Sequence, residues 1–297
     1  MKNNLRSLVI DGNYMLFQSF YATYRGDLTT ILRTSSGITT NAIAIFLSQL
    51  IKLIKFIEPT HLMIAFDAEG KTKRHEIFPE YKKGRMKAPQ ELFDQFDIIK
   101  KLLSLLKVKW IEQAGDEADD IIGTYCKNFE GQKFIFSSDK DLLQLVDQNT
   151  SYIIKKGYEL SLVTFENFFE IYQMHPKDIT SYKGLKGDSS DNLPGVKGIG
   201  DKTAIKLIET YGNFQNLYDL LESNNLPESK SILDKLVKGK ESGFLSYNLS
   251  QINTKILNLS LDPSEYKINF DYDNALEYIE ELELSKFKKD LQSLLKK

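Results

Sequence analysis

The sequence has little of what thiolate metal centres and disulfide-stabilised folds require. Its 297 residues include one cysteine, Cys126, which excludes an internal disulfide framework and a thiolate metal cluster. The three histidines, His61, His75 and His175, are scattered without ligand spacing, and no nucleophile motif accompanies them. The neighbours of Cys126 place it on the apolar side of a helix, so we expect a small buried thiol.

A long hydrophobic run is also missing. No apolar stretch is long enough to cross a membrane, and residues 1–4 lead directly into a strand-like segment without a signal-peptide core. The sequence therefore predicts a soluble protein of the cytoplasm. Its hydrophobic content of 41% is sufficient for a core, and its length allows one large domain or two modest ones. A net charge of −2 argues only weakly against a nucleic-acid partner.

Strand-like and helix-like segments alternate in the first half of the chain. We expect buried strands at residues 5–10, 61–66, 108–111 and 133–136, and helices at 14–24, 40–57 and 89–106. This order predicts an α/β domain at residues 1–174, with a mostly parallel sheet covered on both faces. A hairpin is expected at 151–163, and a helical domain at 175–297, whose last segment, 262–297, suggests packing support.

Acidic residues gather where a helix is expected to begin. Four of them lie within the five positions 116–120. Glu117 and Asp120 are three residues apart and share a helix face, whereas Asp119 points further round. Two carboxylates about 5 Å apart repel by roughly 3 kcal/mol at an effective dielectric constant near 20, and a helix N-terminus offsets only part of this. A hard cation such as Mg²⁺ or Mn²⁺ would supply the remainder; the alternative is a solvated, acid-rich helix start.

Three further aspartates each follow a predicted strand: Asp11, Asp67 and Asp139. In an open parallel sheet, ligands bind at the carboxyl ends of the strands. One such aspartate is usually a helix cap or a turn residue. Several of them, together with the acidic helix start and Asp141, predict one pocket of carboxylates.

A basic stretch follows Asp67 directly. Residues 69–87 contain seven Lys or Arg and three Glu, a charge of +4, with Phe78 and Tyr81 interleaved. Cations with aromatic rings suit a single strand of nucleic acid, because charge follows the backbone and rings stack on bases. The alternative is a solvated loop with ordinary surface lysines. Its position beside the acidic pocket favours a substrate clamp.

A glycine-rich turn is expected at residues 195–200, ahead of a helix. It is not a P-loop, because Asp201 stands between the last glycine and Lys202, and no strand precedes it. It is not a dinucleotide fingerprint, since Thr203 stands where a third glycine is needed. A helix–hairpin–helix at about 183–212 that grips a DNA backbone fits better than a plain turn between helices. Its DNA-binding residues would be Gly195, Val196, Lys197, Gly198, Ile199, Gly200, Lys202 and Thr203.

Several motifs together resemble a known family. They are LVIDG (8–12), AFDA (65–68), RHE (74–76), YK (81–82), EADD (117–120), SDKDL (138–142) and GDSSDNLPGVKGIGDKTA (187–204). In this order, over residues 5–260, the chain resembles the 5′→3′ exonuclease domain of bacterial DNA polymerase I, within the flap endonuclease family. The resemblance implies a resolvase-like (PIN-like) core with a helical arch at about 69–90, followed by the DNA-binding helix–hairpin–helix.

The resemblance also implies two divalent metal sites, for Mg²⁺ or Mn²⁺. The first would use Asp11, Asp67, Glu117, Asp119 and, as an additional candidate, Asp120. The second would use Asp139, Asp141, Asp188 and Asp191, with Asp139 close to both. Leaving these nine carboxylates out of the net charge of −2 gives +7, which suits a DNA binder.

The family's arch and hairpin residues have counterparts too. Lys82 and Arg85 would engage the scissile phosphate, with Arg74 and Tyr81 nearby. The turn at 195–200 would hold duplex phosphates around a monovalent cation such as K⁺.

The expected function is therefore that of a metal-dependent 5′→3′ exonuclease and flap endonuclease in primer removal and DNA repair. Its partners would be DNA with 5′ ends or flaps, an RNA primer, and functionally a DNA polymerase; we expect a stand-alone monomer. One alternative is a catalytically weak DNA-junction binder of the same fold. Another is a PIN-type ribonuclease, but those domains are shorter and lack the hairpin.

Overall fold

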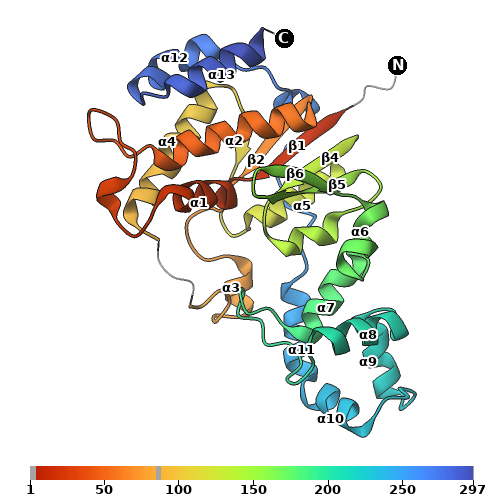
Figure 1. Ribbon diagram of the computed structural model, residues 1–297. Coiled ribbons are helices and arrows are strands. Elements are labelled where there is room, and N and C mark those ends of the chain that lie inside the picture. The colour runs from red at the N-terminus through yellow and green to blue at the C-terminus, as the bar shows by residue number, and fades with distance from the viewer. Residues whose placement is uncertain (1–4, 85–87, 297) are drawn as a thin grey trace.

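The computed structural model describes residues 5–84 and 88–296, in which six strands form one sheet (Figure 1). In spatial order the strands are β3 (Trp110–Ile111), β2 (His61–Ala65), β1 (Arg6–Asp11), β4 (Gln132–Phe136), β5 (Thr150–Lys156) and β6 (Glu159–Val163). All neighbours are parallel except β5 and β6, which form the expected antiparallel hairpin. The central strands read as continuous apolar runs because both faces of the sheet are covered.

Side chains that alternate along β1 divide the core into two layers. Leu8 and Ile10 join the cluster on one face, and Val9 joins the cluster on the other. The first face is covered by α1 (Gly12–Thr23), α2 (Asn41–Ile57) and α4 (Gln90–Leu105). The second is covered by α5 (Ala118–Asn128), the 3₁₀ helix η2 (Lys140–Leu145) and α6 (Phe165–Tyr172). Cys126, as expected, is buried in the second layer.

A helical unit extends from the end of α6, below the sheet in Figure 1. It comprises α7 (Ile179–Lys186), α8 (Asp201–Tyr211), α9 (Phe214–Glu222), α10 (Lys230–Lys238) and α11 (Lys240–Leu249). Leu207, Phe214 and Leu236 belong to a core of its own, and α11 lies against α7. The pair α7 and α8 gives the helix–hairpin–helix that the glycine pattern indicated.

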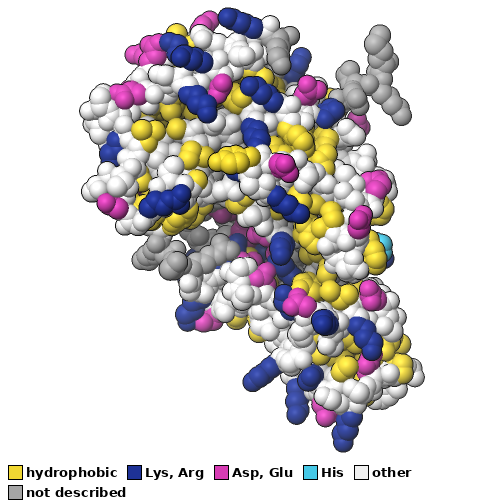
Figure 2. Space-filling view, in the orientation of Figure 1, with side chains coloured by type: hydrophobic (Ala, Val, Ile, Leu, Met, Phe, Trp, Pro, Cys, Tyr) yellow, Lys and Arg dark blue, Asp and Glu magenta, His cyan; other side chains and the backbone are white. Residues whose placement is uncertain are grey.

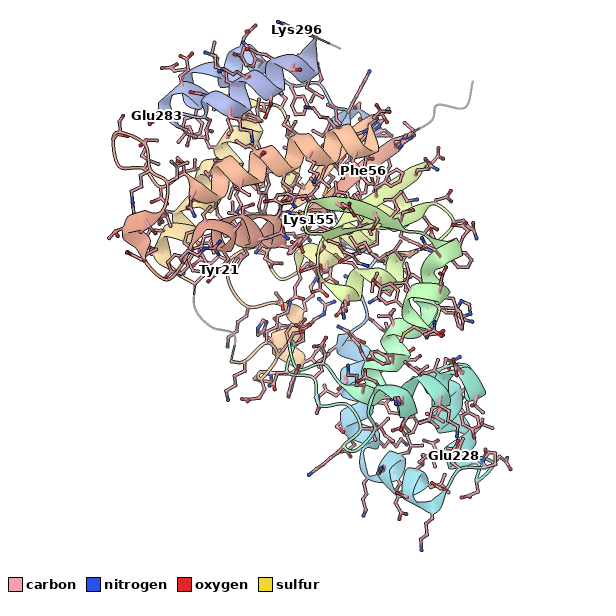
Figure 3. All side chains as sticks on the ribbon, viewed as in Figure 1. Tyr21, Phe56, Lys155, Glu228, Glu283 and Lys296 are labelled. Atoms are coloured by element: carbon pink, nitrogen blue, oxygen red, sulfur yellow. The ribbon has the colours of Figure 1, made fainter. Side chains whose placement is uncertain are left out.

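The last two helices return to the first domain. In α12 (Tyr272–Glu281) and α13 (Ser285–Leu295), Ile279, Phe287 and Leu291 pack into the cluster of α2 and α4. Glu283, labelled in Figure 3, accepts a hydrogen bond from the amide of Ser35 at 2.9 Å. The segment 262–297 therefore has the packing role that the sequence suggested. It packs against the α/β domain, whereas the sequence-based division had grouped it with the helical unit.

Short elements connect these parts. They are η1 (Leu28–Thr30), α3 (Lys73–Ile77), η3 (Pro176–Asp178) and η4 (Pro263–Tyr266). The expected strand at 108–111 is shorter, covering Trp110–Ile111. The described part of the basic stretch contains only the five-residue helix α3 and turns. No helix in residues 5–84 and 88–296 combines the length and apolar character needed to cross a membrane.

Candidate active site

Asp11 and Asp67 lie side by side at the carboxyl edge of the sheet, because β1 and β2 are parallel neighbours. Asp11 ends β1 and caps α1: its carboxylate accepts hydrogen bonds from the Tyr14 amide at 2.9 Å and the Ser137 hydroxyl at 2.7 Å. The Asp67 carboxylate accepts from the amide of Ala118, the first residue of α5, at 2.8 Å. Both are therefore held in fixed orientations by hydrogen bonds, several of them from elements distant in the sequence.

Asp119 and Asp139 complete this group of four carboxylates. Asp139 follows β4 and caps η2, and Asp119 stands in the first turn of α5. Burial raises the pKa of Asp11 to about 7, and the nearby Asp67 and Asp139 add to the shift. Burial also raises the pKa of Asp119, with contributions from Asp139 and Asp11, and that of Asp139. The convergence inferred from strand ends is thus present, and with it the mutual repulsion that a cation would relieve.

These four carboxylates line a cleft of about 830 Å³ between the sheet and the helical unit. Apolar side chains from η2 to α8 also line the cleft, among them Leu143, Met174 and Ile205. Acidic and basic side chains meet in this hollow in Figure 2. The cleft therefore joins the acidic edge of the sheet to the beginning of the helix–hairpin–helix.

Arg74 of α3 binds two acids of the EADD motif. Its guanidinium contacts both oxygens of Asp120, at 2.6 and 2.8 Å, and Glu117 at 3.1 Å. Asp120 also accepts from the amide of Asn253 at 2.8 Å and does not line the cleft. Glu117 and Asp120 share a face, as their spacing indicated, but this geometry suits Asp120 to tying α3, α5 and residues 249–253 together. Its assignment as a metal ligand stays a prediction.

Glu117 is held by two more residues of the basic stretch. The Lys82 ammonium lies 2.9 Å from its carboxylate, and the Tyr81 hydroxyl donates to it at 3.1 Å. The same hydroxyl lies 3.2 Å from Asp191, and burial together with these carboxylates raises the pKa of Tyr81. The basic stretch that the sequence predicts to be a substrate clamp therefore contacts these carboxylates directly. Arg85 lies outside the described residues.

Two of the acids predicted for the second site, Asp141 and Asp188, pair with one lysine that the sequence analysis did not single out. Lys183 of α7 is 6% exposed and pairs with Asp141 and, at 2.5 Å, with Asp188. Burial of Asp188 opposes its ionisation, but Lys183 and Ser190 outweigh it and lower the pKa of Asp188 to about 2. The only sequence signal for Lys183 is its position one helical turn before the GDSSD segment.

Two other residues that contact the site acids were not predicted from the sequence. Ser137, directly after β4, bonds Asp11, and Asn13 donates to the Asp67 carboxylate at 3.0 Å while accepting from its amide. Each lies two positions from a predicted acid, so proximity to the strand ends was the available signal. Both orient carboxylates.

The donor set fits hard divalent cations. Buried carboxylates with raised pKa values gain most from a nearby cation, and oxygen ligands suit Mg²⁺ or Mn²⁺. Within the described residues, no group of three or more His, Cys, Asp or Glu side chains is arranged so that it could hold a metal ion. Mg²⁺ does not require such a group, because it usually keeps several waters and takes one or two carboxylates.

The predicted hairpin residues divide into exposed and buried sets. Gly198 and Gly200 are exposed, as are Lys197 and Lys202, and Thr203 is half-buried. Val196 and Ile199 instead anchor the turn in the core of the helical unit. The exposed set can meet a phosphate.

Gly195 has no substitute at this turn. Its φ is +59°, and a Cβ there would lie 2.2 Å from the Gly187 amide nitrogen. The two ends of the loop, at Gly187 and Gly195, therefore approach each other more closely than residues with a side chain would allow.

Comparisons with known proteins agree with this arrangement. Residues 6–173 match the model of the 5′-3′ exonuclease N-terminal resolvase-like domain, and residues 174–292 match that of the 5′-3′ exonuclease C-terminal SAM fold. A 5′-3′ exonuclease of Mycoplasmopsis pulmonis is 36% identical, over 96% of this chain and 95% of that protein. DNA polymerase I of Lactococcus lactis is 38% identical over 98% of this chain, which spans about a third (33%) of that protein's length.

A solved structure shows the same fold. The flap endonuclease of bacteriophage T5, crystallised with DNA and metal ions, has a TM-score of 0.65 at 20% identity, covering 98% of this chain and 100% of that one. The family models cover both the α/β domain and the helical unit, and the relative of matching length carries the family's name. The chain therefore belongs to the 5′-3′ exonuclease family of nucleases.

Proposed function

We propose that this chain hydrolyses phosphodiester bonds of DNA at 5′ ends and 5′ flaps, using two divalent ions of the Mg²⁺ or Mn²⁺ class. The observation that carries the proposal is the meeting of Asp11, Asp67, Asp119 and Asp139 in one cleft. Family membership and the metal ions crystallised with the T5 flap endonuclease support it.

The chain's own residues have separable tasks in such a reaction. Bound ions would activate water and stabilise charge on the phosphate. Asp11 and Asp67 would hold them, because Ser137 and Asn13 fix how these carboxylates face the cleft. Glu117 and Asp119 would complete the first site, and Asp139, Asp141, Asp188 and Asp191 the second.

Lys82 is the residue best placed to meet the scissile phosphate. Lys82 lines the cleft, and its ammonium contacts the Glu117 carboxylate beside the group of acids. Its ammonium would stabilise the charge that develops on the phosphate oxygens. Arg85 would act with it, and Arg74 and Tyr81 would keep the basic stretch seated on α5.

The substrate would be held beyond the cleft by the helix–hairpin–helix. Its exposed backbone amides and lysines suit duplex phosphates, with K⁺ as a candidate ion at the turn. We infer a role in primer removal and repair beside a DNA polymerase, with RNA primers as further substrates. We also propose, as the sequence predicts, that the protein acts as a monomer in the cytoplasm.

Cleavage of a labelled 5′-flap duplex in Mg²⁺ tests the proposal. Asp67→Asn should slow single-turnover cleavage by roughly 10²-fold or more, the order that one electrostatic contributor to a transition state supplies. Asp273→Asn, an exposed acid in α12, is the matched control. Unchanged cleavage by Asp67→Asn would exclude this cleft. Product sizing on matched DNA and RNA flaps identifies the bond cut and the preferred strand.

A further inference from the structure

The hairpin after α7 is fixed to the start of α11 by hydrogen bonds at one glycine. The amide of Gly195 donates to the Ser246 hydroxyl at 2.9 Å, and the Ser242 hydroxyl donates to the Gly195 carbonyl at 2.7 Å. Both serines belong to α11. The Gly195 backbone cannot shift without losing one of these hydrogen bonds, so the turn keeps a set position relative to α11.

Packing against Val196 reinforces this attachment. A Cβ added to Gly239, between α10 and α11, would lie 2.8 Å from Val196, and one added to Gly243 would lie 3.0 Å from it. The helices therefore approach the hairpin as closely as glycine allows. The hairpin, the end of α10 and the start of α11 form one rigid block.

Lys235 of α10 reaches over the tip of the hairpin. Its ammonium donates to the Gly198 carbonyl at 3.2 Å, and a Cβ on Gly198 would lie 3.1 Å from its Cε. An ammonium has three N–H donors, so this contact leaves others for a ligand at the tip. The bond places a positive charge beside the exposed backbone of the turn.

Other lysines lie close in the sequence to Lys235 or to the tip of the hairpin. Lys238 is three residues after Lys235 and shares its helix face. Within the described part of the chain, neither of them makes an ion pair, and nor do Lys197 and Lys202 of the hairpin segment. Lys240, by contrast, is paired with Glu222. Lysines project from this end of the helical unit in Figure 2.

The chemistry of this surface selects a double-stranded partner. Along α8 to α11 the described aromatic side chains are buried or half-buried, so no exposed ring is available to stack on an unpaired base. Positive charge without stacking groups suits the phosphates of a duplex, which position the protein without reading sequence.

We propose that α10, through Lys235 and Lys238, extends the hairpin into one continuous binding surface for the duplex backbone. The inference rests on the proposed function for the nature of the ligand. It assigns a DNA-contacting role to a helix whose sequence carries no motif.

A measurement of duplex binding under conditions that prevent cleavage tests this proposal. Fluorescence anisotropy with a blunt DNA duplex, in EDTA and over a series of salt concentrations, gives both affinity and the number of phosphates contacted. In the double variant Lys235→Ala, Lys238→Ala, the salt slope should fall in magnitude by about 1.8, or about 0.9 per phosphate, with roughly 10-fold weaker binding at moderate salt. The double variant to Arg should restore the slope, because charge is retained.

Two controls separate this role from a structural one. Lys55→Ala, an exposed lysine at the end of α2, should leave the slope unchanged, and the double Ala variant should unfold at the wild-type temperature. An unaltered slope in a folded double variant would overturn the inference, even if the wild type cleaves flaps. A reduced slope in a protein that cleaves no flap would sustain the inference and refute the proposed function.

Discussion

Lys183, which is buried, and Asp188, which is half-buried, form an ion pair of 2.5 Å at the edge of the cleft, and Lys183 also contacts the buried Asp141. A cation supplied by the protein thus neutralises two of the acids predicted for the second metal site. We therefore expect the stability of the metal-free protein and its affinity for metal to be coupled at this lysine.

Lys183→Met should destabilise the metal-free protein by roughly 3 kcal/mol, because breaking a buried pair leaves uncompensated charge. Urea unfolding in EDTA measures this. Mg²⁺ should raise the melting temperature of the variant more than that of the wild type, since the ion replaces the lost charge. Lys186→Met, whose partner Asp201 is exposed, is the control and should change stability little. Equal Mg²⁺ responses would argue against the coupling.

The metal-free protein should lose stability as pH rises from about 4 to about 7. The pKa of Asp11 is raised to about 7 in the folded state, so the folded state binds more protons than the unfolded one across this window. The raised pKa values of Asp119 and Asp139 act in the same direction. Urea unfolding over a pH series should show a smaller slope in Asp11→Asn, and saturating Mg²⁺ should flatten the profile. Stability that rises over this window and is indifferent to Asp11→Asn would contradict the assignment.

Lys82→Ala should lower single-turnover flap cleavage by roughly 10²–10³-fold, as expected when a donor to developing charge is removed. The neighbouring Lys83 offers a close control, because it pairs with the exposed Glu80 and does not line the cleft. Lys83→Ala should cleave at nearly the wild-type rate. Similar losses in both variants would indicate general attraction of DNA rather than a role at the phosphate.

Asp120→Asn separates a structural role from metal binding. Asp120 is engaged by Arg74 and by the Asn253 amide, so we expect a loss of roughly 3 kcal/mol in unfolding free energy and unchanged Mg²⁺ affinity by calorimetry. Arg74→Met should cause a similar loss, since it breaks the same pair. Weaker Mg²⁺ binding in a fully stable Asp120→Asn would instead make it a ligand.

The sequence was sufficient to predict the strands and the turn, because both depend on local patterns of residues. Apolar runs ending in aspartate located the strands, and parallel pairing then required Asp11 and Asp67 to meet. Gly195 and Gly198 marked the turn in the same way, and both have the positive φ that other residues rarely adopt.

Long-range pairing was not predictable. The contacts of Arg74 and Lys82 with Glu117 were not predicted, because a sequence shows charges but not their partners. Asp141 and Lys183 are 42 positions apart, and only the packing of η2 beside α7 brings them together. Helical spacing in α12 and α13 indicated a buried face without indicating that α2 and α4 would cover it.

The return of α12 and α13 to the first domain has a consequence for synthesis on the ribosome. Leu291 is fully buried against helices formed from the first third of the chain, so that domain is finished only when nearly every described residue has left the exit tunnel. The helical unit, whose core cluster lies between residues 182 and 247, can form earlier. Truncation after α11 would leave an apolar face of α2 and α4 uncovered and prone to aggregation.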